Sequence, residues 1–186
     1  MTDKSVNPRG AAEGDTSGLL AAAKTARKRG PAPVHLWNPP FCGDLDMEIR
    51  RDGSWFYNGT PIGRPEMVRL FSTILKREGD KFFLVTPVEK VGIRVQDAPF
   101  VAVDAEAEGD TLVFTTNVGD RIAVGPENLI RIDGTEDEPR PYLHVRGGLD
   151  ALIDRKTFYR LADLAETDAA GRLILKLAGL TIPLEP

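Results

Sequence analysis

The sequence contains one cysteine among 186 residues and no long apolar run. The single Cys42 excludes an intrachain disulfide, which suits a reducing compartment. No stretch approaches the roughly 18 apolar residues needed to cross a bilayer. The short apolar run at 19–23 precedes the basic residues at 24–29, which is the reverse of the order in a signal peptide. These absences predict a cytoplasmic protein without a membrane segment.

The sequence also lacks an excess of positive charge. It has 24 lysines and arginines against 28 aspartates and glutamates, which gives a formal net charge of −4. A protein that coats DNA or RNA needs a basic face, so no nucleic-acid partner is expected. A few local arginines are still sufficient to hold a small anionic ligand.

Metal-binding and catalytic motifs are scarce as well. Structural zinc requires about four ligands, mostly cysteine or histidine, and the chain offers Cys42 and the widely separated His35 and His144. A nucleophilic Cys42 would need an adjacent base and an oxyanion donor set, and no nucleophile elbow follows it. We therefore expect no metal, no cofactor and no catalytic site, with Cys42 small and buried. A hydrolase that uses Cys42 or His144 is the weakest alternative.

Hydropathy patterns predict the secondary structure of the first half. Leu45, Met47 and Ile49 alternate with charged residues, as on a strand with one buried face. Asp52-Gly53 is a hairpin turn signal, and Pro65 suits the first position of a helix. The order is hairpin, helix, hairpin, with strands at 45–49 and 54–57, a helix from Pro65 to a stop at 78–80, and strands at 82–85 and 91–95.

The remainder of the chain is richer in strands. Strands are predicted within 100–132 and at 142–146, 173–177 and 180–184, with a helix at about 155–166. Gly147-Gly148 ends a strand without the lysine and hydroxyl residue of a phosphate-binding loop, which indicates a turn with positive φ. At the N-terminus, residues 17–29 are either a short helix or a frayed basic arm.

The chain contains an internal repeat. A shift of 91 positions superimposes four identical residues around the two helices, namely Ile62, Arg64, Arg69 and Leu70 on Ile153, Arg155, Arg160 and Leu161. The same shift, without a gap, aligns 81–84 with 172–175. Shared amphipathic periodicity explains matching apolar residues, but it does not explain a matching arginine before and within each helix.

The repeat predicts the fold class, which is α+β. One apolar helix stripe needs a sheet face to cover it, so each hairpin–helix–hairpin repeat is predicted to close a curved antiparallel sheet with one helix. We assign residues 1–33 to a disordered or short-helix arm, 34–97 to the first repeat and 98–186 to the second. Inserted strands make the second repeat larger.

Two blocks of the sequence resemble a bacterial family. The first block is Trp37-Asn-Pro-Pro-Phe-Cys-Gly with Asp52-Gly53-x-Trp55-x-Tyr57 and Ile62-x-Arg64-Pro65, and the second is Tyr142-x-His-Val-Arg146-Gly-Gly with Ile153-x-Arg155. The family is catalogued as a domain of unknown function, family 1285, without an established activity. The resemblance covers roughly residues 34–184. It implies a duplicated α+β fold, a second domain similar to pleckstrin-homology-like barrels, and a site between the domains for a nucleobase-containing ligand in signalling.

Aromatic residues and arginines provide the candidate site. Tryptophan and tyrosine rings offer stacking faces, and arginine forks bind carboxylate or phosphate. Because each repeat places an arginine just before its helix, pseudo-symmetry is expected to bring these arginines to the shared interface. The predicted ligand-binding residues are Trp37, Trp55, Tyr57, Arg64, Tyr142, Arg146 and Arg155. The alternative is structural, with aromatic residues in the core and arginines paired with Asp46, Asp150 or Asp154.

The sequence therefore predicts a non-catalytic protein that senses a small anionic, nucleotide-like ligand between its repeats. The alternative is an adaptor that binds a protein partner through an exposed strand edge or apolar patch.

Overall fold

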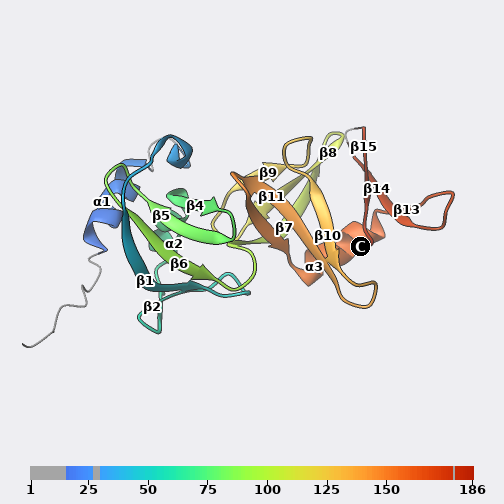
Figure 1. Ribbon diagram of the computed structural model, residues 1–186. Coiled ribbons are helices and arrows are strands. Elements are labelled where there is room, and N and C mark those ends of the chain that lie inside the picture. The colour runs from blue at the N-terminus through green and yellow to red at the C-terminus, as the bar shows by residue number, and fades with distance from the viewer. Residues whose placement is uncertain (1–15, 27–29, 178) are drawn as a thin grey trace, which may run out of the picture.

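The computed structural model describes residues 16–26, 30–177 and 179–186. Two units follow one another along the chain and lie side by side (Figure 1). The first unit carries two α-helices, a short 3-10 helix and one sheet, namely α1 (Ser17–Ala26), η2 (Val34–Leu36), α2 (Pro65–Thr73) and a six-stranded sheet. The second carries α3 (Arg155–Asp163), a six-stranded sheet and a three-stranded sheet. Among the described residues, no helix is long and apolar enough to cross a membrane.

The first sheet has the strand order β3-β2-β1-β6-β5-β4. Its strands are β1 (Phe41–Ile49), β2 (Trp55–Tyr57), β3 (Thr60–Pro61), β4 (Leu75–Glu78), β5 (Lys81–Val85) and β6 (Lys90–Val95). β1 and β2 form the predicted hairpin, with Gly53 at a φ of 82° in the turn. β6 pairs with β1 in parallel, because the chain returns to β1 only after crossing through α2. The prediction of a purely antiparallel sheet is therefore wrong.

Helix α2 is shorter than predicted and ends at Thr73 instead of 78–80. Leu75 already belongs to β4, where it lies opposite Leu84 of β5. Its buried side chain fits both helical spacing and strand alternation, so periodicity alone extends the helix too far. Each repeat therefore consists of a hairpin, a helix and three strands. Helix α3 also ends before its predicted end at about 166, namely at Asp163.

The second sheet has the strand order β10-β11-β12-β7-β8-β9. Its strands are β7 (Phe100–Glu108), β8 (Thr111–Thr116), β9 (Arg121–Ala123), β10 (Ile130–Gly134), β11 (Pro139–Arg146) and β12 (Leu149–Ile153). It is also mixed, because β12 pairs with β7 in parallel. Gly147 and Gly148 form the β11–β12 turn at φ values of 54° and 76°, which confirms the predicted turn.

The hydrogen-bond register confirms the internal repeat. In the first unit, β5 and β6 pair with Leu84 opposite Val91. In the second unit, β14 (Leu173–Leu177) and β15 (Leu180–Pro183) pair with Leu175 opposite Ile182. Both residues of this pair lie 91 positions after their counterparts. The duplication therefore extends from the helix into the pairing of the strands.

The two units differ in what lies beside the hairpin that precedes each helix. In the first unit, β6 pairs with β1, the first strand of that hairpin. In the second unit, the inserted β10 pairs with the corresponding strand, β11. β15 lies next to β10 but belongs to a separate sheet with the order β13-β14-β15, in which β13 spans Glu166–Thr167. The insertion has thus displaced the last three strands into a sheet of their own.

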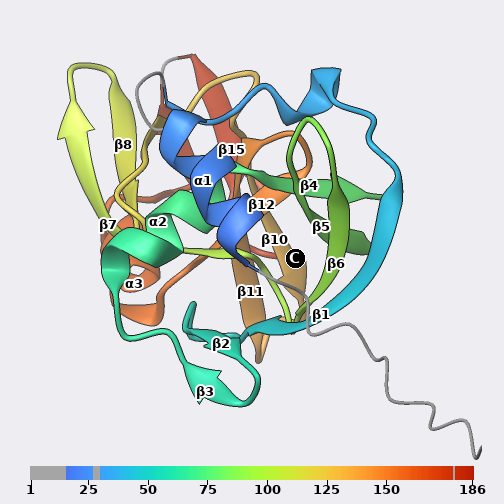
Figure 2. The ribbon, with the colours of Figure 1, turned by 90° about the vertical axis from the view of Figure 1, so that its left-hand side faces the viewer.

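Helix α1 packs against α2 and belongs to the core of the first unit (Figure 2). Leu19 and Ala23 of α1 are buried in the same hydrophobic cluster as Trp55 and Phe71, and these two rings stack at 6.2 Å between centres. Residues 17–26 are therefore a helix. Within the expected N-terminal arm of residues 1–33, residues 1–15 and 27–29 lie outside the described residues.

Candidate ligand site at the interface between the units

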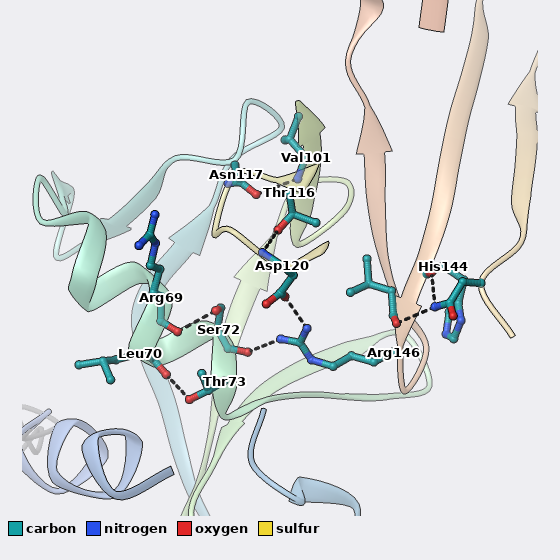
Figure 3. A network of polar contacts seen from close by, with 12 residues as sticks. Arg69, Leu70, Ser72, Thr73, Val101, Thr116, Asn117, Asp120, His144 and Arg146 are labelled. Carbon is teal, nitrogen blue, oxygen red and sulfur yellow. Dashed lines mark hydrogen bonds and ion pairs between the residues drawn. The ribbon is translucent and has the colours of Figure 1, made fainter. Parts of the chain in front are cut away.

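Arg146 connects the two units at the end of β11 (Figure 3). One guanidinium nitrogen donates to Asp120 Oδ2 at 2.6 Å, and the other donates to the carbonyl oxygen of Ser72 in α2 at 3.0 Å. The guanidinium also lies 5.0 Å from the centre of the Phe100 ring. Arg146 is thus at the interface, as predicted, and its charge is shared between a carboxylate, a carbonyl and an aromatic face.

Tyr142 makes a second connection, to the segment that joins the units. Its buried hydroxyl donates to Asp97 Oδ1 at 2.6 Å, and Asp97 also faces Arg51 Nε at 3.5 Å. Burial, and then the hydrogen bond to the Asp97 carboxylate and its charge, raise the pKa of Tyr142 to about 12. The neutral phenol is therefore the stable form in the folded protein.

The raised pKa of Tyr142 predicts a loss of stability in alkali. The folded state keeps the phenol proton that the unfolded chain releases at its ordinary pKa of 10.0. This contribution is complete below pH ~10 and disappears as the pH rises through ~12. We expect the free energy of unfolding to fall by about 2–3 kcal/mol more in the wild type than in Tyr142→Phe over this range. Urea unfolding at a series of pH values measures the difference, and parallel curves would contradict it.

The cavity beside Tyr142 has mixed charge. It has a volume of about 330 Å³ and is lined by Asp80, Asp97, Asp133 and Asp150 together with Arg77 and Arg131. Arg131 lies over the Tyr142 ring at 4.6 Å and pairs with Asp150 at 2.9 Å. Four carboxylates against two guanidinium groups make this cavity unfavourable for an anion.

A second interface cavity has the opposite character. This basic cavity has a volume of about 220 Å³ and lies between η2 with the preceding Ala32, β4 and the β11–β12 turn. Its charged and titratable lining residues are His35, Lys76, Arg77 and Arg146, and the apolar ones include Ala32, Val34, Leu75 and Leu149. None of its lining residues is a carboxylate. An anion is the ligand that this lining favours.

Arg77 is the cation of this cavity with the least compensation. Its guanidinium donates to the carbonyl oxygens of Gly79 at 2.8 Å and Gly148 at 3.1 Å. It has no carboxylate partner in the part of the chain that the structure describes. Lys76, in contrast, pairs with Glu78 at 3.1 Å. The two carbonyl oxygens therefore fix the position of the Arg77 guanidinium without neutralising its charge, which can then attract an anion.

Trp37 lines an adjoining apolar cavity of about 300 Å³, formed by α1, the 31–33 segment and Pro87. Ala32 lines both this cavity and the basic cavity. The carbonyl oxygen of Trp37 accepts a hydrogen bond from Lys76 Nζ at 3.3 Å. The structure thus brings two predicted site residues, Trp37 and Arg146, to neighbouring cavities.

The other predicted site residues lie elsewhere. Trp55 is buried in the core against Phe71, as the structural alternative proposed, and Tyr57 packs against that core from β2. Arg64 and Arg155 do stand at the helix starts, but both are exposed and neither lines the interface cavities. Pseudo-symmetry relates the helices without bringing their first residues to the interface.

The proposed ion pairs and the environment of Cys42 also need correction. Asp46 pairs with Arg94, Asp150 pairs with Arg131, and Asp154 accepts the Thr157 N–H as the N-cap of α3. The predicted partners of the site arginines are therefore engaged with other groups. Cys42 is exposed, not buried, because it precedes the alternating part of β1, and its thiol donates to the carbonyl oxygen of Pro40 at 3.4 Å.

His144 is held by backbone groups on both sides of its ring. Nδ1 lies 2.8 Å from the carbonyl oxygen of Glu127, and Nε2 accepts from the Gly148 N–H at 3.2 Å. The described residues contain no cluster of three or more histidine, cysteine or acidic side chains that fits a metal ion. The imidazole thus supports the β11–β12 turn.

The ligand-binding residues predicted from the sequence do not include Lys76, Arg77 or His35. The first two fall in the segment assigned to the end of α2, where they read as exposed basic residues. The pattern that could have revealed Arg77 is strand alternation over 75–78, because it places this residue on an edge strand of the first sheet.

Two units that share one helix-and-strand pattern and one register define a duplicated α+β protein. Family models agree with this division. The N-terminal domain of DUF1285, a domain of unknown function, matches residues 32–98, and the C-terminal domain of DUF1285 proteins matches residues 99–184. The chain belongs to the DUF1285 family.

Two solved structures of this family are similar to the chain. The crystal structure of a DUF1285 family protein from Silicibacter pomeroyi DSS-3 is 62% identical, covers 90% of this chain and 94% of its own, and has a TM-score of 0.81. A DUF1285 family protein from Shewanella baltica OS155 is 31% identical, covers 64% of this chain and 91% of its own, and has a TM-score of 0.53. No curated protein matches the chain.

Proposed function

We propose that this protein is a non-catalytic sensor that binds a small anionic ligand in the basic cavity between its units. The observation that carries the proposal is the lining of that cavity, which combines Lys76, Arg77 and Arg146 with apolar side chains and contains no carboxylate. Cationic forks in a partly apolar site recognise phosphate or carboxylate with good geometry. Arg77 is the principal anion contact, because among the described residues no carboxylate lies within ion-pair distance of its guanidinium.

The adjoining cavities favour a ligand with a flat apolar part. The basic cavity, at about 220 Å³, accommodates a compact anionic group. The cavity at Trp37 is apolar and suits a ring that stacks on the indole. Because Ala32 borders both, a nucleobase at Trp37 with its phosphate at Arg77 is the arrangement that we propose. Such a ligand would contact both units and so stabilise their association.

The proposal is tested by ligand-dependent thermal stability. A ligand at about 100 times its Kd stabilises the native state by roughly 2.7 kcal/mol. We expect inorganic phosphate and nucleoside phosphates to raise the Tm of the wild type, and Arg77→Gln to abolish the shift. Arg94→Gln is the control, because Arg94 forms an exposed ion pair with Asp46 and does not line the cavity.

A second variant separates the two parts of the ligand. Trp37→Leu is expected to weaken nucleoside phosphates while leaving inorganic phosphate unchanged. An absence of any anion-induced shift, or an equal shift in the wild type and Arg77→Gln, would refute the anionic site.

A further inference from the structure

The second unit has an open, partly apolar groove that shares no lining residue with the ligand cavities described above. This C-terminal groove, of about 720 Å³, lies between the β7–β8 hairpin and the β14–β15 hairpin. Its apolar lining includes Leu112, Leu164, Leu175, Leu177 and Leu180. Leu164, at the end of α3, is 59% exposed. An exposed leucine next to the half-buried Leu177 and Leu180 indicates an apolar surface that another element covers.

The internal repeat shows what covers the equivalent surface in the first unit. There the N-terminal segment folds over the end of α2, and the Ala32 N–H donates to the Thr73 carbonyl oxygen at 2.9 Å. Helix α1 approaches the β5–β6 turn so closely that a Cβ at Gly18 would lie 3.1 Å from Glu89 Oε1. Thr73 and Glu89 therefore mark the surface that the N-terminal segment covers.

A shift of 91 positions transfers both markers to the C-terminal groove. Thr73 corresponds to Leu164, and Glu89 corresponds to Leu180. Both leucines line the groove. Among the described residues, the second unit has no helix that corresponds to α1. The surface that the first unit covers with its own chain is therefore open in the second unit, and there it carries leucines instead of threonine and glutamate.

The charges around the groove define the occupant further. Asp110 lines the groove and Asp163 directly precedes Leu164, and within the described part of the chain neither carboxylate has an ion-pair partner. The one cation of the lining, Lys176, pairs with Glu166 at 2.8 Å. The charge left without compensation is negative, so a segment with basic residues is complementary.

We infer that the C-terminal groove binds a short amphipathic helix of a partner protein, with a leucine and alanine face and a basic end. The helix docks against α3 and the β14–β15 hairpin as α1 docks against α2. The partner helix would have the same amphipathic character as α1, which buries Leu19 and Ala23 and carries Lys24 in its last turn. This docking surface shares no lining residue with the basic cavity, so it is independent of the anionic ligand.

The experiment titrates the full chain into a fluorescently labelled synthetic peptide with the sequence of residues 16–31. We expect saturable binding with a Kd in the micromolar range, measured by anisotropy. Leu164→Glu should weaken binding at least about tenfold, since it removes apolar contact and adds a like charge to the acidic rim. Asp110→Lys should weaken it by a smaller factor that declines with added salt. Leu129→Glu, at a leucine that is 48% exposed outside the groove, should bind as the wild type does.

Three results would overturn the inference. One is the absence of saturation at millimolar protein. Another is equal binding by the wild type and Leu164→Glu, which would place the peptide on α2 in exchange for α1. The third is a dimer in analytical ultracentrifugation that Leu164→Glu converts to a monomer, which would assign the groove to a second copy of this chain.

Discussion

Replacing Arg146 with methionine is expected to lower the free energy of unfolding by about 2–4 kcal/mol. Methionine keeps an unbranched side chain but removes the guanidinium, and with it the contact to the Phe100 ring and the donors to Asp120 and to the Ser72 carbonyl oxygen. The carbonyl oxygen of the buried Ser72 then loses this donor, and the partly buried Asp120 carboxylate loses its cation, which costs more than the ion pair itself contributes. Because one of these acceptors is in each unit, the loss also weakens the contact between the units.

Arg160→Met is the matched control for this substitution. Arg160 forms an ion pair with Asp104 in which both side chains are nearly half exposed. Exposed pairs contribute up to about 1 kcal/mol, so we expect a much smaller change. Guanidinium chloride unfolding at pH 7 measures both variants, and equal destabilisation would show that Arg146 has no special role between the units.

Gly53→Ala is expected to cost about 3 kcal/mol or more. Gly53 is buried in the β1–β2 turn at a φ of 82°, a conformation that costs an L-residue about 1–2 kcal/mol. A Cβ there would lie 2.6 Å from Asn117 Nδ2 and 3.0 Å from Val101 Cγ2 of the second unit. Asn117 cannot move aside easily, because its Oδ1 accepts the Val101 N–H at 3.0 Å and its Nδ2 donates to the Gly53 carbonyl oxygen at 3.3 Å. Its backbone N–H also donates to the Val101 carbonyl oxygen. Overpacking adds about 1–3 kcal/mol to the backbone cost.

Gly59→Ala isolates the backbone part of that cost. Gly59 has a φ of 73°, and no atom lies within 4 Å of its Cβ position. We expect this variant to lose only the ~1–2 kcal/mol of the left-handed conformation. Thermal and denaturant unfolding of the pair gives the steric contribution by difference. If both variants lost the same stability, the hairpin turn would not be packed against the second unit.

The duplication was accessible from sequence because it rests on residue identities as well as on periodicity. Arg64 and Arg155 mark the start of each helix, and the predicted shift reappears in the strand register. The hairpins were predictable for a related reason, since Gly53, Gly147 and Gly148 lie at positive φ values that few residues other than glycine adopt. Local chemistry was sufficient in both cases.

The parallel pairings of β1 with β6 and of β12 with β7 could not be predicted from local sequence. Whether β6 lies beside β1 or continues an antiparallel meander depends on the path of the chain around α2, and no residue in either strand records it. The same holds for the insertion of β10 beside β11. Leu75 shows the limit at the level of one residue, because a buried position at the end of an amphipathic run satisfies a helix and a strand equally well.

The candidate site was predicted in part for the same physical reasons. Arg146 lines the basic cavity between the units and Trp37 lines the apolar cavity beside it, whereas Arg64 and Arg155 lie exposed at the starts of the helices. Arg77 and Lys76 depend on β4, which sequence periodicity did not separate from α2. Side chains that meet across two units are selected by the contact between the units, and periodicity within one unit carries no information about that contact.

The position of the inserted strands has a consequence for the order in which the chain folds during synthesis. All six strands of the second sheet lie between Phe100 and Ile153, ahead of α3, whereas the first sheet needs strands from both sides of α2. As the chain leaves the ribosome, the second sheet can close before α3 exists, and α3 with β13–β15 is added last to a finished surface. A layer added in this way opens without breaking the sheet beneath it, so its amides should exchange with deuterium ahead of those of the second sheet.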